Sequence, residues 1–268
     1  MKKNKEIINE KIINYTTLKN MNFLDLSVTN WGEVKTHHYD MAILPWGAVE
    51  PHNYHLPYIT DSILTYEIAK DCAREAFEKA EVQAMVMPPL YLGAQNPGQW
   101  EMPFCIHFNS ETQKAVLSDI IASLRVQGLN KLVIINGHGG NTFKSMIRDF
   151  AMKYPDFSII QCDWWTFIPR KGYFEESIDE HAGEQETSVM MHYRPELVHL
   201  LTAGEGAPRP WNMESLNNKT GWMPRNWKNT TVDTGIGNPE KSTAEKGEKY
   251  MNTVREKIVQ LLVEFKNI

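Results

Sequence analysis

Short apolar runs alternate along this chain with longer stretches in which apolar residues recur at helical spacing. The short runs predict buried strands, and the longer stretches predict helices with one buried face. The predicted strands cover 41–45, 82–87, 131–135 and 157–161. Predicted helices cover 31–37, 62–79, 110–127 and 239–265. Two further helices are predicted, one that ends near Lys153 and one that opens within 180–188 and ends near His192. This alternation predicts an α/β fold whose mostly parallel central sheet is covered by helices on both faces.

The remaining segments set the expected domain organisation. Residues 1–22 are polar and weakly helical, and we expect an N-terminal extension there, followed by a single domain over 23–268. The segment 91–108 is rich in Gly, Pro and aromatic residues and has no clear period. Loops of that length in a compact domain are usually functional, so it is expected to form a wall of the active site. The segment 203–239 is expected to cover the site or an interface.

Composition excludes several classes of function. The chain has 268 residues, 42% of them hydrophobic and 23% charged, which is ordinary for a globular protein. A net charge of -5 without an internal basic block argues against nucleic acid as a partner. No apolar run approaches the length of a membrane span, and the N-terminus has no apolar core typical of a signal peptide, so a cytoplasmic protein is expected. Cys72, Cys105 and Cys162 are expected to be buried thiols.

The first polar motif, Gly47 to Asp61, directly follows the first predicted strand and reads GAVEPHNYHLPYITD. It places Glu50, His52, His55 and Asp61 within twelve residues. Mixed carboxylate and imidazole donors suit Zn, Mn, Fe and similar divalent ions. In an extended segment Glu50 and His52 share one face, while Asp61 is expected at the start of the next helix, where it could equally serve as an N-cap.

A second motif, Asn136 to Asn141 (NGHGGN), follows the third predicted strand. Because sites in parallel sheets lie at the carboxyl ends of the strands, both motifs should reach the same edge. The glycines beside His138 allow a close backbone approach, although a simple tight turn with a solvent-facing histidine explains them equally well.

The third motif, Glu180 to Ser188 (EHAGEQETS), adds Glu180, His181, Glu184 and Glu186 to the candidate chemistry. Acids at a helix start can also simply balance the helix dipole. Trp164 and Trp165 follow the fourth strand and are either core residues or the lining of a flat pocket for a small planar ring.

Together with TGIGNPEKSTAEKG at 234–247, these motifs resemble the creatininase (creatinine amidohydrolase) family in the same order over about residues 24–260. The resemblance implies a three-layer α/β/α sandwich, a site with two divalent metal ions, hydrolysis of amide C–N bonds and a hexamer. It makes Glu50, Asp61 and His138 ligands of one ion, and Asp61 and His52 ligands of the second. Creatininases have a glutamate where this chain has Gly140, so Glu186 is the expected substitute.

The other roles follow from the same resemblance. They are His181 with Glu180 for acid/base catalysis, Trp164, Trp165 and His55 for substrate contact, and Asn136 and Asn141 as supports behind the ligands. Two departures put creatinine in doubt as substrate. Ser177 stands where creatininase has a tryptophan that closes the site, and Phe104 within Met102–Ile106 stands where the family has glycine.

The sequence therefore predicts a dinuclear metal-dependent amidohydrolase that acts on a small cyclic or formyl amide, with Zn preferred and Mn or Fe as alternatives. One alternative is a non-catalytic assembly protein stabilised by metal. Another is a dinuclear phosphoesterase, which is disfavoured because the three site motifs contain no Arg or Lys, although Lys144 and Arg170 lie close in sequence.

Overall fold

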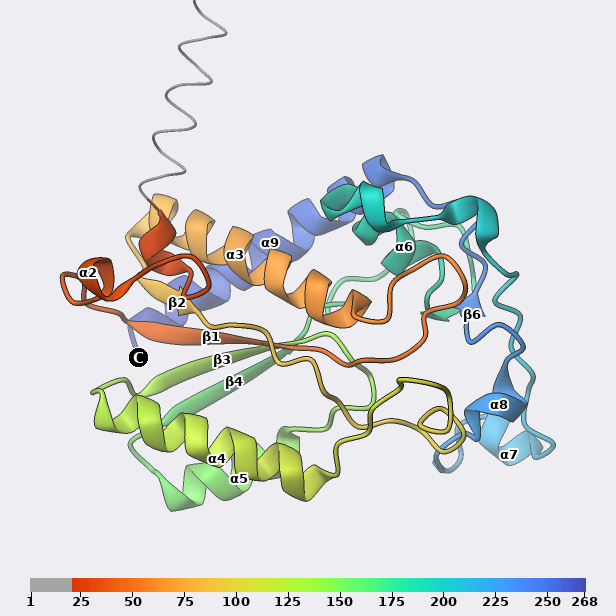
Figure 1. Cartoon of the computed structure of the whole chain (residues 1–268), viewed down its shortest axis with the longest axis horizontal. Coiled ribbons are helices and arrows are strands. Elements are labelled where there is room, and N and C mark those ends of the chain that lie inside the picture. The colour runs from red at the N-terminus through yellow and green to blue at the C-terminus, as the bar shows by residue number, and fades with distance from the viewer. Residues whose placement is uncertain (1–20) are drawn as a thin grey trace, which may run out of the picture.

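A single parallel sheet forms the centre of the molecule in the computed structural model, which describes residues 21–268 (Figure 1). Its strands are β1 (Met41–Trp46), β2 (Ala84–Val86), β3 (Lys131–Asn136) and β4 (Ser158–Asp163), in the order β2-β1-β3-β4. The predicted α/β fold with a mostly parallel sheet is confirmed. The predicted extension over 1–22 lies almost wholly outside the described residues.

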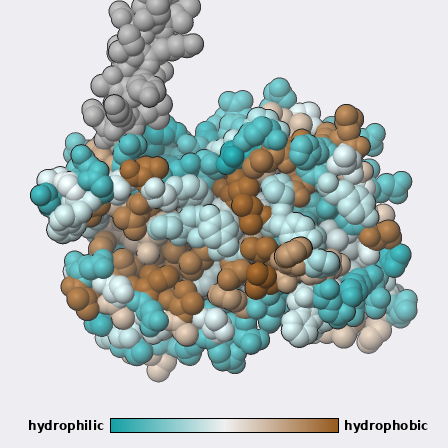
Figure 2. Space-filling model, in the orientation of Figure 1, coloured by the Kyte–Doolittle hydropathy of each residue, from teal (hydrophilic) through white to brown (hydrophobic). Residues whose placement is uncertain are grey.

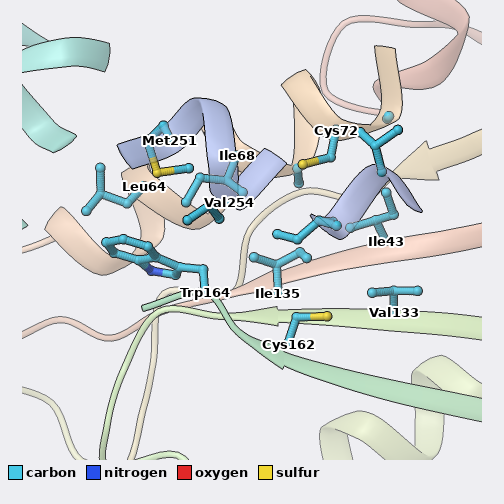
Figure 3. Packing of buried hydrophobic residues seen from close by; sticks show 14 of the residues in the cluster. Ile43, Leu64, Ile68, Cys72, Val133, Ile135, Cys162, Trp164, Met251 and Val254 are labelled. Carbon is cyan, nitrogen blue, oxygen red and sulfur yellow. The ribbon is translucent and has the colours of Figure 1, made fainter. Parts of the chain in front are cut away.

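Helices cover both faces of this sheet. Helices α3 (Thr60–Ala80), α6 (Glu184–Tyr193) and α9 (Ala244–Lys266) pack on one face, and α4 (Ser110–Val126) and α5 (Lys144–Lys153) pack on the other. Successive side chains of a strand point to opposite faces. Met41 and Ile43 accordingly join the hydrophobic cluster under α3 and α9 (Figure 3), whereas Ala42 and Leu44 join the cluster over α4 and α5.

Short elements complete the described chain. They are η1 (Asn22–Leu24), α2 (Trp31–Val34), β5 (Asp179–His181), η2 (Pro195–Leu197), η3 (Leu200–Thr202), α7 (Glu214–Asn217), α8 (Trp227–Thr230) and β6 (Ile236–Gly237). Asn30 caps α2, where its Oδ1 accepts a hydrogen bond from the backbone N–H of Gly32 at 2.9 Å.

Two helix starts differ from the sequence prediction, whereas α4 begins at Ser110 as predicted. Helix α3 begins at Thr60 after the N-cap Ile59, so Asp61 lies inside the first turn rather than at the cap. Helix α9 begins at Ala244 and not near Pro239, because the Thr243 hydroxyl accepts a hydrogen bond from Lys246 N at 3.2 Å and supplies the cap.

The segment predicted as one helix opening within 180–188 contains a strand and a helix. Strand β5 pairs antiparallel with β6, and α6 begins only at Glu184. The partner strand lies far away in sequence, so local periodicity gave no sign of this pairing. It joins the third motif to the fourth one, TGIGNPEKSTAEKG, and places Glu180 and His181 on a strand.

The surface is mixed in character. The face seen in Figure 2 carries hydrophobic groups between hydrophilic ones, and several large apolar side chains of the protein, Phe104 and Trp222 among them, are exposed. Within residues 21–268, none of the helices combines the length and apolar character that a membrane span requires.

Helices α6 and α9 lie in close contact at Gly247. A Cβ atom at this position would come within 2.0 Å of the Ser188 carbonyl oxygen, which is far below van der Waals distance. The absence of a side chain at Gly247 therefore lets α9 fix the position of α6, the helix that contains Glu186.

We expect Gly247→Ala to lower the free energy of unfolding by about 1–3 kcal/mol, because the two helices must separate. An alanine inside a helix would otherwise be favoured by about 1 kcal/mol over glycine, so the sign of the effect is diagnostic. Urea denaturation measures it, with Glu248→Ala at an exposed neighbouring position as the control, expected to change stability by less than about 0.5 kcal/mol. A Gly247→Ala variant as stable as the native protein would contradict this packing.

Candidate metal centre

The first turn of α3 is pressed against the ends of two strands. A Cβ atom on Gly47, just after β1, would lie 2.4 Å from Ser62 N, and one on Gly137, just after β3, would lie 2.7 Å from Asp61 O. Only glycine permits both approaches. The two strand ends therefore hold Asp61 between them at the carboxyl edge of the sheet, where the parallel topology predicts a site.

Six side chains from the three motifs meet at this edge. Their donor atoms form overlapping groups in which all atoms lie within 4.8 Å of one another: Glu50, Asp61 and His138; His52, Asp61 and Glu186; and Glu50, His52 and His181. The first two groups contain all of the residues predicted to bind metal. Of these, Glu50, His52, Asp61 and His138 are buried.

Asp61 belongs to both of those groups and faces each with a different oxygen. Its Oδ1 lies 3.0 Å from Nε2 of His52, and its Oδ2 lies 3.3 Å from Nδ1 of His138. Although Oδ2 is buried, it has no hydrogen-bond partner among the described residues. The carboxylate is thus placed to serve two neighbouring positions at once.

Backbone carbonyls orient the histidine rings. Nδ1 of His52 lies 3.0 Å from Glu50 O, Nε2 of His138 lies 2.7 Å from Ala94 O, and Nε2 of His181 lies 3.0 Å from Pro51 O. Because a carbonyl oxygen only accepts hydrogen bonds, each of these ring nitrogens must donate. The opposite nitrogen of each ring then faces the carboxylates, which is the tautomer and orientation that metal-binding histidines require.

The charges at the centre are strongly coupled. Burial disfavours the charged form of His52, but the carboxylates of Glu186 and Asp61 outweigh burial and raise its pKa well above the ordinary value. Glu50 and Asp61 act in the same way on the pKa of His138. Burial alone would raise the pKa of Asp61, yet His52 and His138 hold it well below its usual range. A cation at the centre would replace the protons shared within this cluster.

Two asparagines support the loop that holds His138. Asn136 Nδ2 donates to the His138 carbonyl at 3.1 Å and to Asp163 Oδ1 at 2.8 Å. Asn141 Nδ2 donates to Gly47 O at 3.2 Å, and its Oδ1 accepts from Ala94 N at 3.1 Å. These contacts join the ends of β1, β3 and β4 to the segment whose carbonyl orients His138, which is the supporting position expected for both residues.

The acids of the third motif separate in the structure. Glu186 faces the centre, with Oε1 at 3.6 Å from His52 Nε2 and Oε2 accepting from Ala182 N at 2.7 Å. Glu184 is buried away from it and pairs with Lys246. Glu180 lies at the rim, where Arg225 forms an ion pair with it.

His55 is brought near the centre but not onto its surface. The side chain is buried, Nε2 lies 2.8 Å from the Thr187 hydroxyl, and burial lowers its pKa to about 4. It does not line the cavity beside the centre. His55 therefore stands behind the helix turn that contains Glu186, and its position gives no support to the predicted substrate contact.

The segment 91–108 contributes residues that sequence reasoning missed. Gln99 is buried and its Nε2 donates to Glu50 Oε2, so it fixes one of the candidate ligands. The only signal in the sequence was the length and composition of the loop. In the same loop Phe104 is 86% exposed and adopts φ +62°, a conformation that favours the glycine expected there from the family resemblance.

A cavity of about 320 Å³ opens beside the centre and is lined by Glu50, Asp61, Gly137, His138, Gly139, Trp164, Trp165, Asp179, Glu180, His181, Gln185 and Glu186. The rings of Trp164 and Trp165 meet edge to face, with centroids 6.1 Å apart and planes at 78°. They form a corner rather than two parallel walls. A second cavity of about 390 Å³ shares Glu50, His138 and His181 with the first and extends to Trp222 and Arg225.

A parallel α/β fold with an imidazole–carboxylate centre at the carboxyl edge of its sheet has the make-up of a hydrolase. Comparison with known proteins agrees with this class. The sequence model described as creatininase, creatinine amidohydrolase, matches residues 27–262, and the chain belongs to the creatininase family.

Individual relatives extend the comparison. The crystal structure of a putative creatinine amidohydrolase from Bacteroides fragilis NCTC 9343 is 56% identical, covers 91% of this chain and 97% of its own, and superimposes with a TM-score of 0.90. The mycofactocin precursor peptide peptidase of Mycolicibacterium smegmatis is 27% identical over 73% of each chain. A mutant creatininase of the Zn–Zn type shares the fold at 23% identity, covering 90% of this chain and 97% of its own, with a TM-score of 0.73.

Gly140 tests the link between the Ala94 carbonyl and the centre. A Cβ atom at Gly140 would lie 1.9 Å from Ala94 O and 2.5 Å from His138 Nε2, the two atoms that form this contact, whereas one at Gly139 would meet no described atom within 4 Å. We expect Gly140→Ala to break the contact between the carbonyl and the His138 ring and to weaken metal binding about 10- to 100-fold, a typical cost of losing such a contact. Competition with a chelator measures the affinity, and Gly139→Ala is the matched control. Equal affinities in the two variants would contradict the assigned role of Ala94 O.

Proposed function

We propose that this protein is a dinuclear metal-dependent hydrolase that cleaves the C–N bond of a small cyclic or formyl amide. The observation that supports this most directly is Asp61, whose two oxygens face the histidines of two separate donor groups. In this proposal Glu50, Asp61 and His138 hold one ion, and His52, Asp61 and Glu186 hold the other. Imidazole and carboxylate donors suit Zn first, with Mn or Fe as alternatives.

The close contact at Gly140 favours Glu186 as the remaining ligand of the second ion. Creatininases have a glutamate at the position of Gly140. Here any side chain at that position would collide with the Ala94 carbonyl, while Glu186 Oε1 already lies 3.6 Å from His52 Nε2.

Two divalent ions held in this way would activate water as a nucleophile near neutral pH and polarise the amide carbonyl. The nitrogen that leaves must gain a proton, and His181 is placed to supply it. Its Nε2 is held by the Pro51 carbonyl, and its Nδ1 lies 3.9 Å from Glu50 Oε1, facing the centre. Imidazole exchanges protons readily at physiological pH. Glu180, its neighbour at the rim, is held by Arg225 and would orient or share that proton.

The alternatives have less support. A phosphoesterase needs cations against its substrate, but among residues 21–268 no Lys or Arg lines the cavity beside the centre. Arg170 is engaged instead, with NH1 2.9 Å from Asp179 Oδ2. A metal site that only stabilises an assembly is normally closed. Here an open cavity adjoins the centre and His181 faces it, which fits a catalytic site better than a purely structural one.

Metal content per chain is the direct test. Elemental analysis of protein purified without chelator should give about two divalent ions per chain. Asp61→Asn should lose both, because its carboxylate serves both donor groups, and Glu186→Gln should lose mainly one. Glu180→Gln, which changes an acid of the cavity outside those groups, is the control and should retain both. Two tightly bound ions in Asp61→Asn would refute the shared-ligand arrangement.

His181→Asn separates proton transfer from metal binding. We expect it to keep the metal content and to lower kcat about 10²- to 10⁴-fold, the usual size of a general acid–base contribution. The assay is hydrolysis of whichever member of a panel of cyclic and formyl amides the metal-loaded protein cleaves, with His192→Asn as the control at a position outside the cavity. Metal loss comparable to that of Asp61→Asn would instead make His181 a ligand.

A further inference from the structure

Two residues that line the cavity beside the metal centre carry buried N–H donors without an acceptor. They are Trp164 and Gln185, whose Nε1 and Nε2 atoms have no hydrogen-bond partner among the described residues. Trp164 is 2% exposed and Gln185 is 5% exposed. Buried donors in folded proteins nearly always have an acceptor, so each exception requires an explanation. A ligand that brings an acceptor to these donors would supply the missing hydrogen bonds.

Both donors are held in place by the fold. Gln185 lies in the first turn of α6, and its backbone N–H donates to Asp179 Oδ2 at 2.8 Å. Trp164 belongs to the hydrophobic cluster under α3 and α9, and Figure 3 shows its ring among the side chains of that cluster. Side chains fixed on rigid elements in this way are suited to recognition.

Tyr250 is the one neighbour that offers another explanation for Gln185. Its hydroxyl lies near the Gln185 side chain, and burial raises its pKa above the ordinary value while Gln185 partly opposes this. That hydroxyl donates to Ile168 O at 3.3 Å, and Gln185 Nε2 has no hydrogen bond of normal geometry within the described part of the chain. The amide is therefore free to serve a ligand.

The charge of the cavity restricts what the donors can bind. Glu50, Asp61, Asp179, Glu180 and Glu186 line it, and no lining residue within 21–268 is a Lys or Arg. In the proposed function two divalent ions offset Glu50, Asp61 and Glu186. Asp179 and Glu180 are paired with Arg170 and Arg225. A carboxylate or phosphate bound by Trp164 and Gln185 would meet only neutral N–H donors there and no free cation, which makes its burial costly. A neutral carbonyl oxygen, which has two lone pairs and accepts from N–H groups, meets no such penalty.

We propose that Trp164 Nε1 and Gln185 Nε2 form a carbonyl-binding subsite, which holds a neutral carbonyl of the substrate other than the one that is cleaved. This inference rests on the proposed function, because it takes the metal centre as the place of the cleaved amide. It narrows the substrate class to compact, uncharged amides with a second carbonyl, such as cyclic imides and ureides.

Glutarimide and 2-piperidone provide a matched pair of probes, because they share a six-membered lactam ring and differ by one carbonyl oxygen. Calorimetric titration of the metal-loaded protein, with product formation followed in parallel, should show tighter binding of glutarimide by about tenfold or more, the usual effect of one buried hydrogen bond. Gln185→Met removes an N–H at similar volume, whereas Trp164→Phe removes one together with part of a buried ring system. Each should reduce that preference about 5- to 10-fold and leave the 2-piperidone affinity unchanged within about threefold.

Stability provides a second readout. Since Gln185→Met removes an unpartnered donor at similar volume, its urea midpoint should stay equal or rise. Trp164→Phe also leaves a void in the core and should lower the midpoint, and neither variant should change the metal content. A lower midpoint of Gln185→Met, or equal weakening of both probes in either variant, would assign the residues to packing and overturn the subsite. Tyr250→Phe should keep the preference for glutarimide, and its loss there would mean that Gln185 acts through Tyr250.

The remaining outcomes distinguish a failure of the subsite from a failure of the proposed function. If the protein cleaves amides but Gln185→Met and Trp164→Phe keep the native preference, only the subsite is wrong. If the metal-loaded protein binds neither probe and cleaves no amide in the panel, the proposed function fails together with the subsite.

Discussion

The contact of Gly47 and Gly137 with the first turn of α3 is the constraint on which the site depends. It brings the ends of two neighbouring parallel strands against the backbone of Asp61, so the sheet itself determines where the shared carboxylate lies. The donor groups then form around it, because the motif after β1 provides Glu50 and His52, and the motif after β3 provides His138. The site is thus a direct product of the parallel topology.

Charge balance links this centre to the elements around it. Glu50 and Asp61 are almost fully buried, and a buried carboxylate without a positive partner is costly. Within the centre, the imidazoles of His52 and His138 act as the positive partners. Just outside it, Lys246 pairs with Glu184 and Arg170 pairs with Asp179, so two further buried acids that do not face the centre are neutralised by other parts of the chain. The net negative charge that remains inside matches a site for cations.

Periodicity was sufficient to predict the sheet, the main helices and the edge at which the motifs meet, because strands followed by helices impose a parallel order. Periodicity could not show which residues of one motif face the site and which point elsewhere. Glu184 and Glu186 are two positions apart on α6 and point in different directions, and His55 shares a motif with His52 but turns toward Thr187. Gln99 and the β5–β6 pairing depend on loops and on contacts distant in sequence, where no repeating pattern exists to be read.

The carbonyls that orient the three histidines belong to the backbone of Glu50, Pro51 and Ala94. A carbonyl is present whichever amino acid occupies a position, so no single substitution at Pro51 or Ala94 deletes the oxygen itself. The orientation of the rings can therefore change only when the backbone itself is displaced, as a side chain at Gly140 would force. Side chains such as Gln185 and Trp165, in contrast, are open to replacement one at a time. In a protein built this way, evolution can change what the cavity accepts far more easily than it can change the chemistry at its base.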